Sequence, residues 1–199
     1  MTPHFDLAEV IQTIGYVGLF FVVFAESGLF FGFFLPGDSL LFTAGFLASQ
    51  NIFNIWVLVP LLVTAAISGD STGFWTGKKL GSWLLRQKDT FFFKKKYLTK
   101  AQDFYDKHGG KAIVLARFIP AVRTFAPIAA GIADMHYKTF LSFNIFGGLL
   151  WAAGMTLLGF FLGSAIPDVD NYLLPIVMVI IIASVLPGVI HFLKERKSR

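Results

Sequence analysis

Apolar runs fill most of this chain and define its predicted elements. Three runs, residues 56–77, 141–163 and 172–193, are continuous. Each is long enough to cross a bilayer, which takes about 20 helical residues. Two further runs, residues 10–49 and 112–135, are broken in the middle by glycine and proline. The pattern therefore predicts an all-α integral membrane protein with three complete spans and two interrupted segments.

Each interrupted segment is predicted to form a re-entrant helical hairpin. Its halves are too short to cross a hydrocarbon core of about 30 Å. The breaks fall at Gly28, Gly32, Pro36 and Gly37 in the first segment and at Pro120 and Pro127 in the second. Broken backbone at membrane depth is tolerated only where protein or a watery cavity surrounds it. We therefore expect each hairpin tip to face the protein interior.

Two short patterns recur along the chain. Ala44-Gly45 returns as Ala130-Gly131, and Gly73-Phe74-x-x-Gly77 returns as Gly159-Phe160-x-x-Gly163, both 86 positions later. A hairpin makes no net crossing and the helix after it makes one, so two such units would be inverted relative to each other, as in many secondary transporters. We therefore expect an inverted repeat of one re-entrant hairpin plus one transmembrane helix.

This repeat predicts the domain organisation. Residues 1–199 form a single membrane domain, with repeat 1 at about 10–77, a basic loop at 78–111, repeat 2 at about 112–163 and an extra C-terminal span at 172–193. The composition agrees with a membrane protein, because 55% of the residues are hydrophobic and the mean hydropathy is +0.68.

Most basic residues lie in two regions of the chain. No Lys or Arg precedes Lys78, ten of the seventeen lie in residues 78–111, and four close the chain. By the positive-inside rule, the basic loop and the C-terminus are predicted to be cytoplasmic and the N-terminus to lie outside. The net charge of +5 is then a topology signal, and we expect no nucleic-acid partner. The N-terminal segment lacks a basic n-region, so no signal peptide is expected.

Four charged residues lie within the interrupted apolar segments. Glu26 and Asp38 belong to the first, and Arg117 and Arg123 belong to the second. A charge near the bilayer centre costs roughly 2.5–3.5 kcal/mol on insertion scales, and such residues usually mark a substrate or ion path. Pairing, water or a bound ligand must supply the compensation, which makes a transport site the leading interpretation.

Arginine chemistry favours an anionic ligand at this site. The planar guanidinium binds phosphate oxygens in pairs and stays charged when dehydrated. Arg117, Arg123 and the neighbouring Thr124 are therefore the candidate phosphate-binding residues. Glu26 and Asp38 are candidate proton carriers. The alternative is that the arginines pair permanently with these acids and only hold the structure together.

Other residues in the apolar runs allow a structural interpretation. For Asp70 we favour a structural hydrogen bond over a proton relay. Asn144 and Trp151 would serve equally well in packing or in lining a pathway. The stripes of small residues, Gly69, Gly73 and Gly77 with Gly159 and Gly163, are typical of close helix packing within or between subunits, so a homo-oligomer is possible.

Together these residues resemble the DedA family of bacterial inner-membrane proteins, whose eukaryotic relatives include lipid scramblases. The resemblance rests on Glu26, then Phe34-Leu35-Pro36-Gly37-Asp38, then Gly69-Asp70-x-x-Gly73, and finally Arg117-Phe118-Ile119-Pro120-x-x-Arg123-Thr124-x-x-Pro127, and it covers roughly residues 10–190. It implies two facing re-entrant hairpins and movement of lipid-linked phosphates, above all undecaprenyl phosphate, with proton dependence. It also implies that the functional acids are Glu26 and Asp38 and the functional arginines Arg117 and Arg123.

The expected function is thus a proton-coupled flippase in the bacterial inner membrane that returns undecaprenyl phosphate to the inner leaflet. A phospholipid flippase or scramblase, an ion or proton channel or exchanger, and a structural partner protein are the alternatives. A lipid phosphatase is disfavoured because the membrane motifs contain no nucleophile with a base in reach. The chain has no cysteine and its four histidines are scattered, so we expect neither a metal site nor a cofactor.

Overall fold

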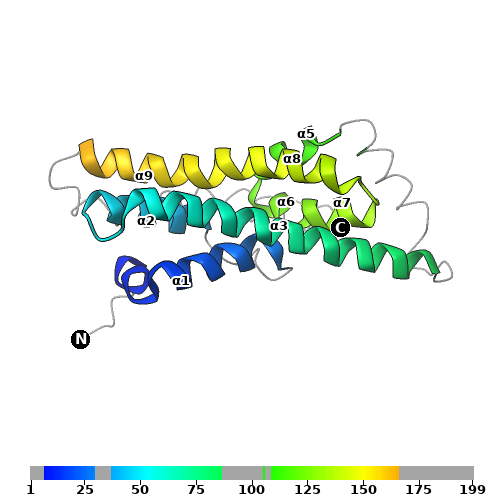
Figure 1. Cartoon of the computed structure of the whole chain (residues 1–199), viewed down its shortest axis with the longest axis horizontal. Helices are drawn as coiled ribbons and strands as arrows, with labels where there is room; N and C mark the ends of the chain where they lie inside the picture. Colours follow the sequence, from blue (N-terminus) through cyan, green and yellow to red (C-terminus); the bar gives the residue numbers. More distant parts are fainter. Residues whose placement is uncertain (1–6, 30–36, 87–104, 106–108, 166–199) are drawn as a thin grey trace, which may run out of the picture. The chain divides into compact units, whose positions relative to one another are not determined.

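The computed structural model describes residues 7–29, 37–86, 105 and 109–165, and everything in these ranges that is regular is helical (Figure 1). The elements are α1 (Leu7–Gly28), α2 (Gly37–Ser49), α3 (Ile55–Arg86), α5 (Lys111–Ala116), α6 (Pro120–Arg123), α7 (Phe125–Ile132), α8 (Tyr137–Gly148), the π-helical turn η2 (Leu149–Ala153) and α9 (Gly154–Ala165). This part of the chain contains no strand, which confirms the all-α prediction.

Two predicted spans correspond to long apolar helices. Residues 55–82 of α3 and the continuous run 137–165, formed by α8, η2 and α9, are long and apolar enough to cross a membrane. Helix α3 continues to Arg86, so the first residues of the predicted basic loop are helical. The predicted span 172–193 lies outside the described residues.

Some helix breaks occur where glycine and proline predicted them, but Pro127 lies inside α7 and a further break, at Gly15 of α1, was not predicted. Helix α1 ends at Gly28 and α2 begins at Gly37, while Pro36 lies outside the described residues. In the second segment α5 ends before Arg117, and Pro120 starts α6 at a position where its missing N–H leaves no helix bond unmade. The re-entrant path of both segments stays a prediction.

The chain divides into two compact units. The first contains residues 7–23, 37–64 and 152–165 of the described chain, and the second contains 24–29, 65–86, 105 and 109–151. Long helices run from one unit into the other. The predicted single membrane domain and its boundaries are not tested by this division and stay a prediction.

In the first unit, α2 and α9 lie side by side (Figure 1). Gly45 lies against the Thr156 carbonyl and Gly159 against the Phe42 carbonyl, so close that a Cβ at either glycine would overlap backbone. Contacts advance together along both helices as far as Gly163, which meets Phe46 and Ser49, so the helices are parallel. Small residues allow two helix backbones to approach closely. In a lipid bilayer this close packing matters because helix association has no hydrophobic driving force.

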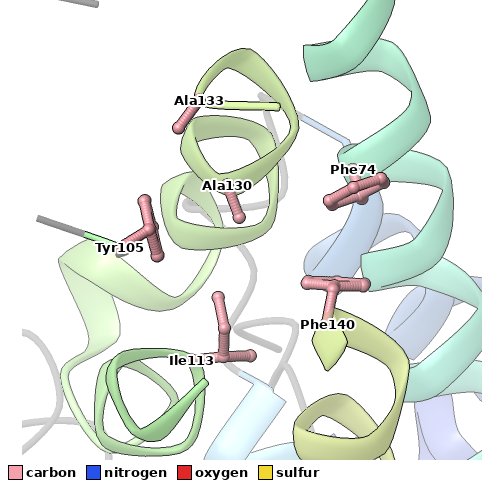
Figure 2. Close-up of a cluster of buried hydrophobic side chains, with 6 residues drawn as sticks. All are labelled: Phe74, Tyr105, Ile113, Ala130, Ala133 and Phe140. Carbon is pink, nitrogen blue, oxygen red and sulfur yellow. The ribbon is translucent and has the colours of Figure 1, made fainter. Parts of the chain in front are cut away.

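In the second unit, α3 and α7 make the same kind of contact. Gly77 lies against the Ile128 carbonyl and Gly131 against the Phe74 carbonyl, again too close for a Cβ. The adjoining core consists of Phe74, Tyr105, Ile113, Ala130, Ala133 and Phe140, and Figure 2 shows the rings of Phe74 and Phe140 face to face. Their centroids are 4.5 Å apart. The Tyr105 hydroxyl donates to the Ala126 carbonyl at 3.0 Å, and burial raises the pKa of Tyr105 to about 12.

Equivalent turns follow α2 and α7. Asn51 and Asp134 both have a positive φ, of 63° and 55°. The N–H of the residue that follows each of them donates to a carbonyl in the last turn of the helix. Ile52 N–H donates to the Leu47 carbonyl at 3.1 Å, and Met135 N–H donates to the Ala130 carbonyl at 3.0 Å. This is the Schellman arrangement, in which a left-handed residue satisfies carbonyls that the helix leaves open. Both turns lead directly into the long apolar helices.

The repeated contacts refine the internal repeat. Gly45 and Gly131 make equivalent contacts 86 positions apart, as the sequence predicts. On the long helices, however, Gly77 corresponds to Gly159 and Gly81 to Gly163, an offset of 82 rather than 86. The difference of four arises because α7 ends sooner after its packing glycine than α2 does, and because its turn is one residue shorter. Four residues are close to one helical turn, so the packing face is preserved.

Candidate functional site

Arg117 is held where the second interrupted segment breaks. It is the residue after α5, and its backbone N–H donates to the Val114 carbonyl at 3.3 Å. Its side chain is 4% exposed and crosses α8 at Gly147, where a Cβ would come within 2.9 Å of Arg117 Cδ. Gly147 thus leaves the space in which the guanidinium lies, a role for which the sequence offered no signal beyond the Gly147-Gly148 pair.

Two side chains accept hydrogen bonds from the Arg117 guanidinium. Its Nη2 donates to Asp70 Oδ2 of α3, forming a buried ion pair, and to Asn144 Oδ1 of α8. The Asn144 amide donates in turn to the Ile67 carbonyl at 3.1 Å. Asn144 therefore connects Arg117 to the backbone of α3. Arg117 Nε has no hydrogen-bond partner among the described residues.

Arg123, the last residue of α6, has a different acid partner. Its Nη2 donates to Glu26 Oε1 near the end of α1, and Glu26 is 1% exposed. The adjacent Thr124 hydroxyl, fully buried, donates to the Glu26 backbone carbonyl at 3.4 Å. Among the described residues of the second unit, two ion pairs thus join an arginine to an acid, Arg117 to Asp70 and Arg123 to Glu26.

Trp151 links the two arginines. Its ring centroid lies 5.8 Å from Arg117 Cζ and 4.8 Å from Arg123 Cζ, both within cation–π range. Trp151 belongs to η2, and π-helical turns occur frequently at functional sites.

The charges at this site balance and are almost entirely withdrawn from solvent. Removing one partner of a buried ion pair typically costs about 3–5 kcal/mol, because the other charge is left uncompensated. A ligand that takes over the arginines must therefore bring negative charge of its own. Planar guanidinium groups are best suited to carboxylate or phosphate oxygens.

The structure brings four of the predicted site residues together. Arg117, Arg123, Thr124 and Glu26 meet in the second unit, with Asp70 as the acid partner of Arg117. Asp38 is in the first turn of α2 in the first unit and is partly buried. Gly37, Pro120 and Pro127, which we also expect to support the site together with Pro36 and Asp70, occupy helix ends and packing positions: Gly37 begins α2, Pro120 begins α6, and Pro127 is buried in α7. Among the described residues no group of three His, Asp or Glu side chains could hold a metal ion.

Comparisons with known proteins agree with this picture. Residues 35–164 match the VTT domain. The chain is 44% identical to Protein DedA of Escherichia coli K12, over 98% of this chain and 92% of that protein. It is 41% identical to an uncharacterised membrane protein of Mycobacterium tuberculosis H37Rv, over 92% and 80% of the two chains, and 36% identical to the inner membrane protein YghB of E. coli K12, over 81% and 74%. No solved structure matches the chain significantly.

Proposed function

This chain belongs to the DedA family of VTT-domain membrane proteins, and on that premise we propose that it is a flippase for a lipid phosphate. The proposed substrate is undecaprenyl phosphate or a similar lipid phosphate, moved from the outer to the inner leaflet of the bacterial inner membrane. The basic loop and the C-terminus would face the cytoplasm, as the charge distribution predicts.

The arginine pair is the observation that carries the proposal. Arg117 and Arg123 are 4% and 10% exposed, belong to one compact unit and share the Trp151 ring. Two guanidiniums within reach of one aromatic ring offer two planar donor sets to a single small anion. We assign phosphate binding to these two side chains, with the Thr124 hydroxyl as an additional donor.

Proton coupling follows from the acids. A phosphate that binds Arg123 competes with Glu26, and a carboxylate that loses its cation in a buried site is stabilised by taking up a proton. We therefore propose that Glu26 carries a proton with each transport cycle. Asp38, from the other interrupted segment, is the second proposed carrier, on the strength of its intramembrane position in the sequence.

The lipid tail has an apolar surface to follow in the second unit. Large side chains on α5, on α6 and around α6 are exposed, namely Leu115, Phe118, Ile119, Val122 and Phe125. In a bilayer, exposed apolar side chains are solvated by lipid chains. We propose that the tail stays in the membrane along this surface while only the phosphate head enters the protein.

A zwitterionic phospholipid is the second candidate substrate. The observation that favours it is that two carboxylates accompany the two guanidiniums, which gives partners to an ammonium as well as to a phosphate. A phosphodiester carries one negative charge, however, and would occupy the arginine pair less completely than a monoester.

The proposal is tested with the full chain in liposomes that contain labelled undecaprenyl phosphate or a labelled phospholipid. The leaflet distribution is followed with and without a pH gradient. We expect the wild type to move the lipid phosphate faster with the gradient, and Arg123→Ala to abolish that movement. Lys138→Ala, which removes an exposed cation of α8 in the same unit, is the matched control and should behave as wild type.

Each outcome of this experiment has a distinct meaning. Movement of the phospholipid alone would replace the proposed substrate by the second candidate. Undiminished transport by Arg123→Ala would remove the phosphate-binding assignment.

A further inference from the structure

Asp70 occupies the same position toward Arg117 that Glu26 occupies toward Arg123. Each acid accepts from Nη2 of its own arginine, and the two acids are 3% and 1% exposed. Among the described residues, Arg117 is the ion-pair partner of Asp70. Sequence alone favoured a structural hydrogen bond for Asp70, but its partner is one of the two proposed phosphate-binding groups.

Few ionisable groups of the described residues lie near Asp70. Arg117 reaches it from α5, and Arg123 and Glu26 belong to the same buried cluster. Helix α7 has no ionisable side chain. Those of α8, Tyr137 and Lys138, are about two helical turns away from Asn144 along the helix. On α3 itself the nearest is Lys78, which pairs with Asp134 at 2.9 Å.

This arrangement fixes what happens when a phosphate dianion enters. Before binding, two arginines and two carboxylates sum to zero charge. After binding, two arginines and a dianion also sum to zero, provided that both displaced carboxylates are neutral. A buried carboxylate without its cation is strongly disfavoured. The arrangement therefore balances only if two protons enter with the phosphate.

We propose that binding of a lipid phosphate monoester takes up two protons, one on Asp70 and one on Glu26. This inference rests on the proposed function and adds Asp70 to it as a proton-exchanging partner of the phosphate site. Asp38 keeps its proposed role as a carrier at another step of the cycle, so it does not enter the number of protons taken up on phosphate binding.

Asn144 acts in this exchange as the neutral anchor of Arg117. It accepts from Arg117 and donates to the Ile67 carbonyl, so it keeps the guanidinium in place when Asp70 is protonated. Arg117 Nε, which has no hydrogen-bond partner among the described residues, gives the phosphate a donor that Asp70 does not use. Tetrahedral phosphate can accept from Nε and Nη2 together, which is the bidentate geometry that arginine favours.

The proton count is measured directly by titration calorimetry. The purified full chain in lipid nanodiscs is titrated with octyl phosphate at pH 7.5 in buffers of different ionisation enthalpy. At this pH the monoester, whose second pKa is about 6, is largely a dianion. We expect wild type to take up about two protons per phosphate and Asp70→Asn about one, because linkage counts each group that changes protonation.

Two further variants keep the test independent of folding defects. Asp70→Glu retains an ionisable group and should restore the wild-type count. Asp134→Asn removes an exposed acid of the same unit and should leave the count unchanged. A wild-type count of one proton or fewer would overturn the inference without any variant.

The outcomes separate this inference from the proposed function. Binding by wild type with an uptake of one proton or fewer would overturn the role of Asp70 while leaving the phosphate site intact. An unchanged count of two in a folded Asp70→Asn would do the same. If wild type bound no octyl phosphate, the proposed function would fail and this inference with it.

Discussion

The two compact units share one kind of helix–helix contact but differ in their buried polar groups. In the first, α2 and α9 meet through Gly45 and Gly159, and in the second, α7 and α3 meet through Gly131 and Gly77. The buried polar groups of the first unit include the hydroxyls of Ser39, Thr43 and Thr156. Those of the second include both arginine–acid pairs. The comparison shows that, in the part of the chain that the structure describes, the same kind of helix contact occurs with and without buried arginine–acid pairs.

By these sequence offsets, two charged residues of the second unit correspond to uncharged residues of the first. The position equivalent to Asp70 is Ala152, which is fully buried, and the position equivalent to Arg123 is Gly37. Asp38 corresponds to Thr124. Buried charge is therefore not a requirement of the packing, which supports a functional origin for the charges in the second unit.

The largest expected difference between the units concerns buried polar groups. Arg117→Ala leaves Asp70 as an uncompensated buried charge and should destabilise the protein by roughly 3–5 kcal/mol. Thr156→Val in the first unit removes a hydroxyl that has no hydrogen-bond partner among the described residues, and should be neutral or slightly stabilising. Thermal unfolding in nanodiscs measures both. Equal losses would contradict the contrast between the units.

The next largest prediction is a loss of stability that should be equal in the two units. Gly45→Ala and Gly131→Ala each place a methyl group against a backbone carbonyl, and each should cost roughly 1–3 kcal/mol of stability through overpacking. Gly154→Ala is the control, because nothing lies within 4 Å of a Cβ there and alanine favours helix. A loss confined to one unit in the same unfolding assay would refute the equivalence of the two contacts.

The smallest expected effect concerns Trp151, which lies beside both arginines in the second unit. Trp151→Leu removes the ring that both guanidiniums approach, and the cation–π contribution is worth roughly 0.5–2 kcal/mol. We expect a loss of about 2- to 30-fold in octyl phosphate affinity, with Trp151→Phe intermediate. Trp56→Leu, at an exposed position of the first unit, should leave the affinity unchanged. Unaltered affinity in Trp151→Leu would mean that the ring only packs.

Sequence patterns predicted the elements better than the partners. Continuous apolar runs located α3 and the run 137–165, because span length depends on local hydrophobicity. Gly28, Gly37 and Pro120 marked helix ends. Pro127, in contrast, is accommodated in the first turn of α7, where a missing N–H breaks no helix bond. Helix α3 continues beyond residue 77, since Lys78 and the residues after it are compatible with helix as well as with a cytoplasmic position.

Arg117, Arg123 and Glu26 were singled out as charged residues in apolar segments, but their ion-pair partners were not predicted. Arg117 pairs with Asp70, 47 residues away, and Arg123 with Glu26, 97 residues away. The packing of several helices determines which acid pairs with which arginine. The sequence around an acid in an apolar run does not indicate its arginine partner. The π-helical turn that carries Trp151 and the space left by Gly147 likewise depend on tertiary contacts.

The most direct test of the central claim removes one whole ion pair rather than half of it. In Glu26→Leu/Arg123→Met both buried charges are replaced by apolar side chains of similar size, a change that is often neutral or stabilising. We predict that this double variant folds with at least wild-type thermal stability and fails to move labelled undecaprenyl phosphate in liposomes. Transport at the wild-type rate would mean that the pair only holds the structure together, and would contradict the phosphate site.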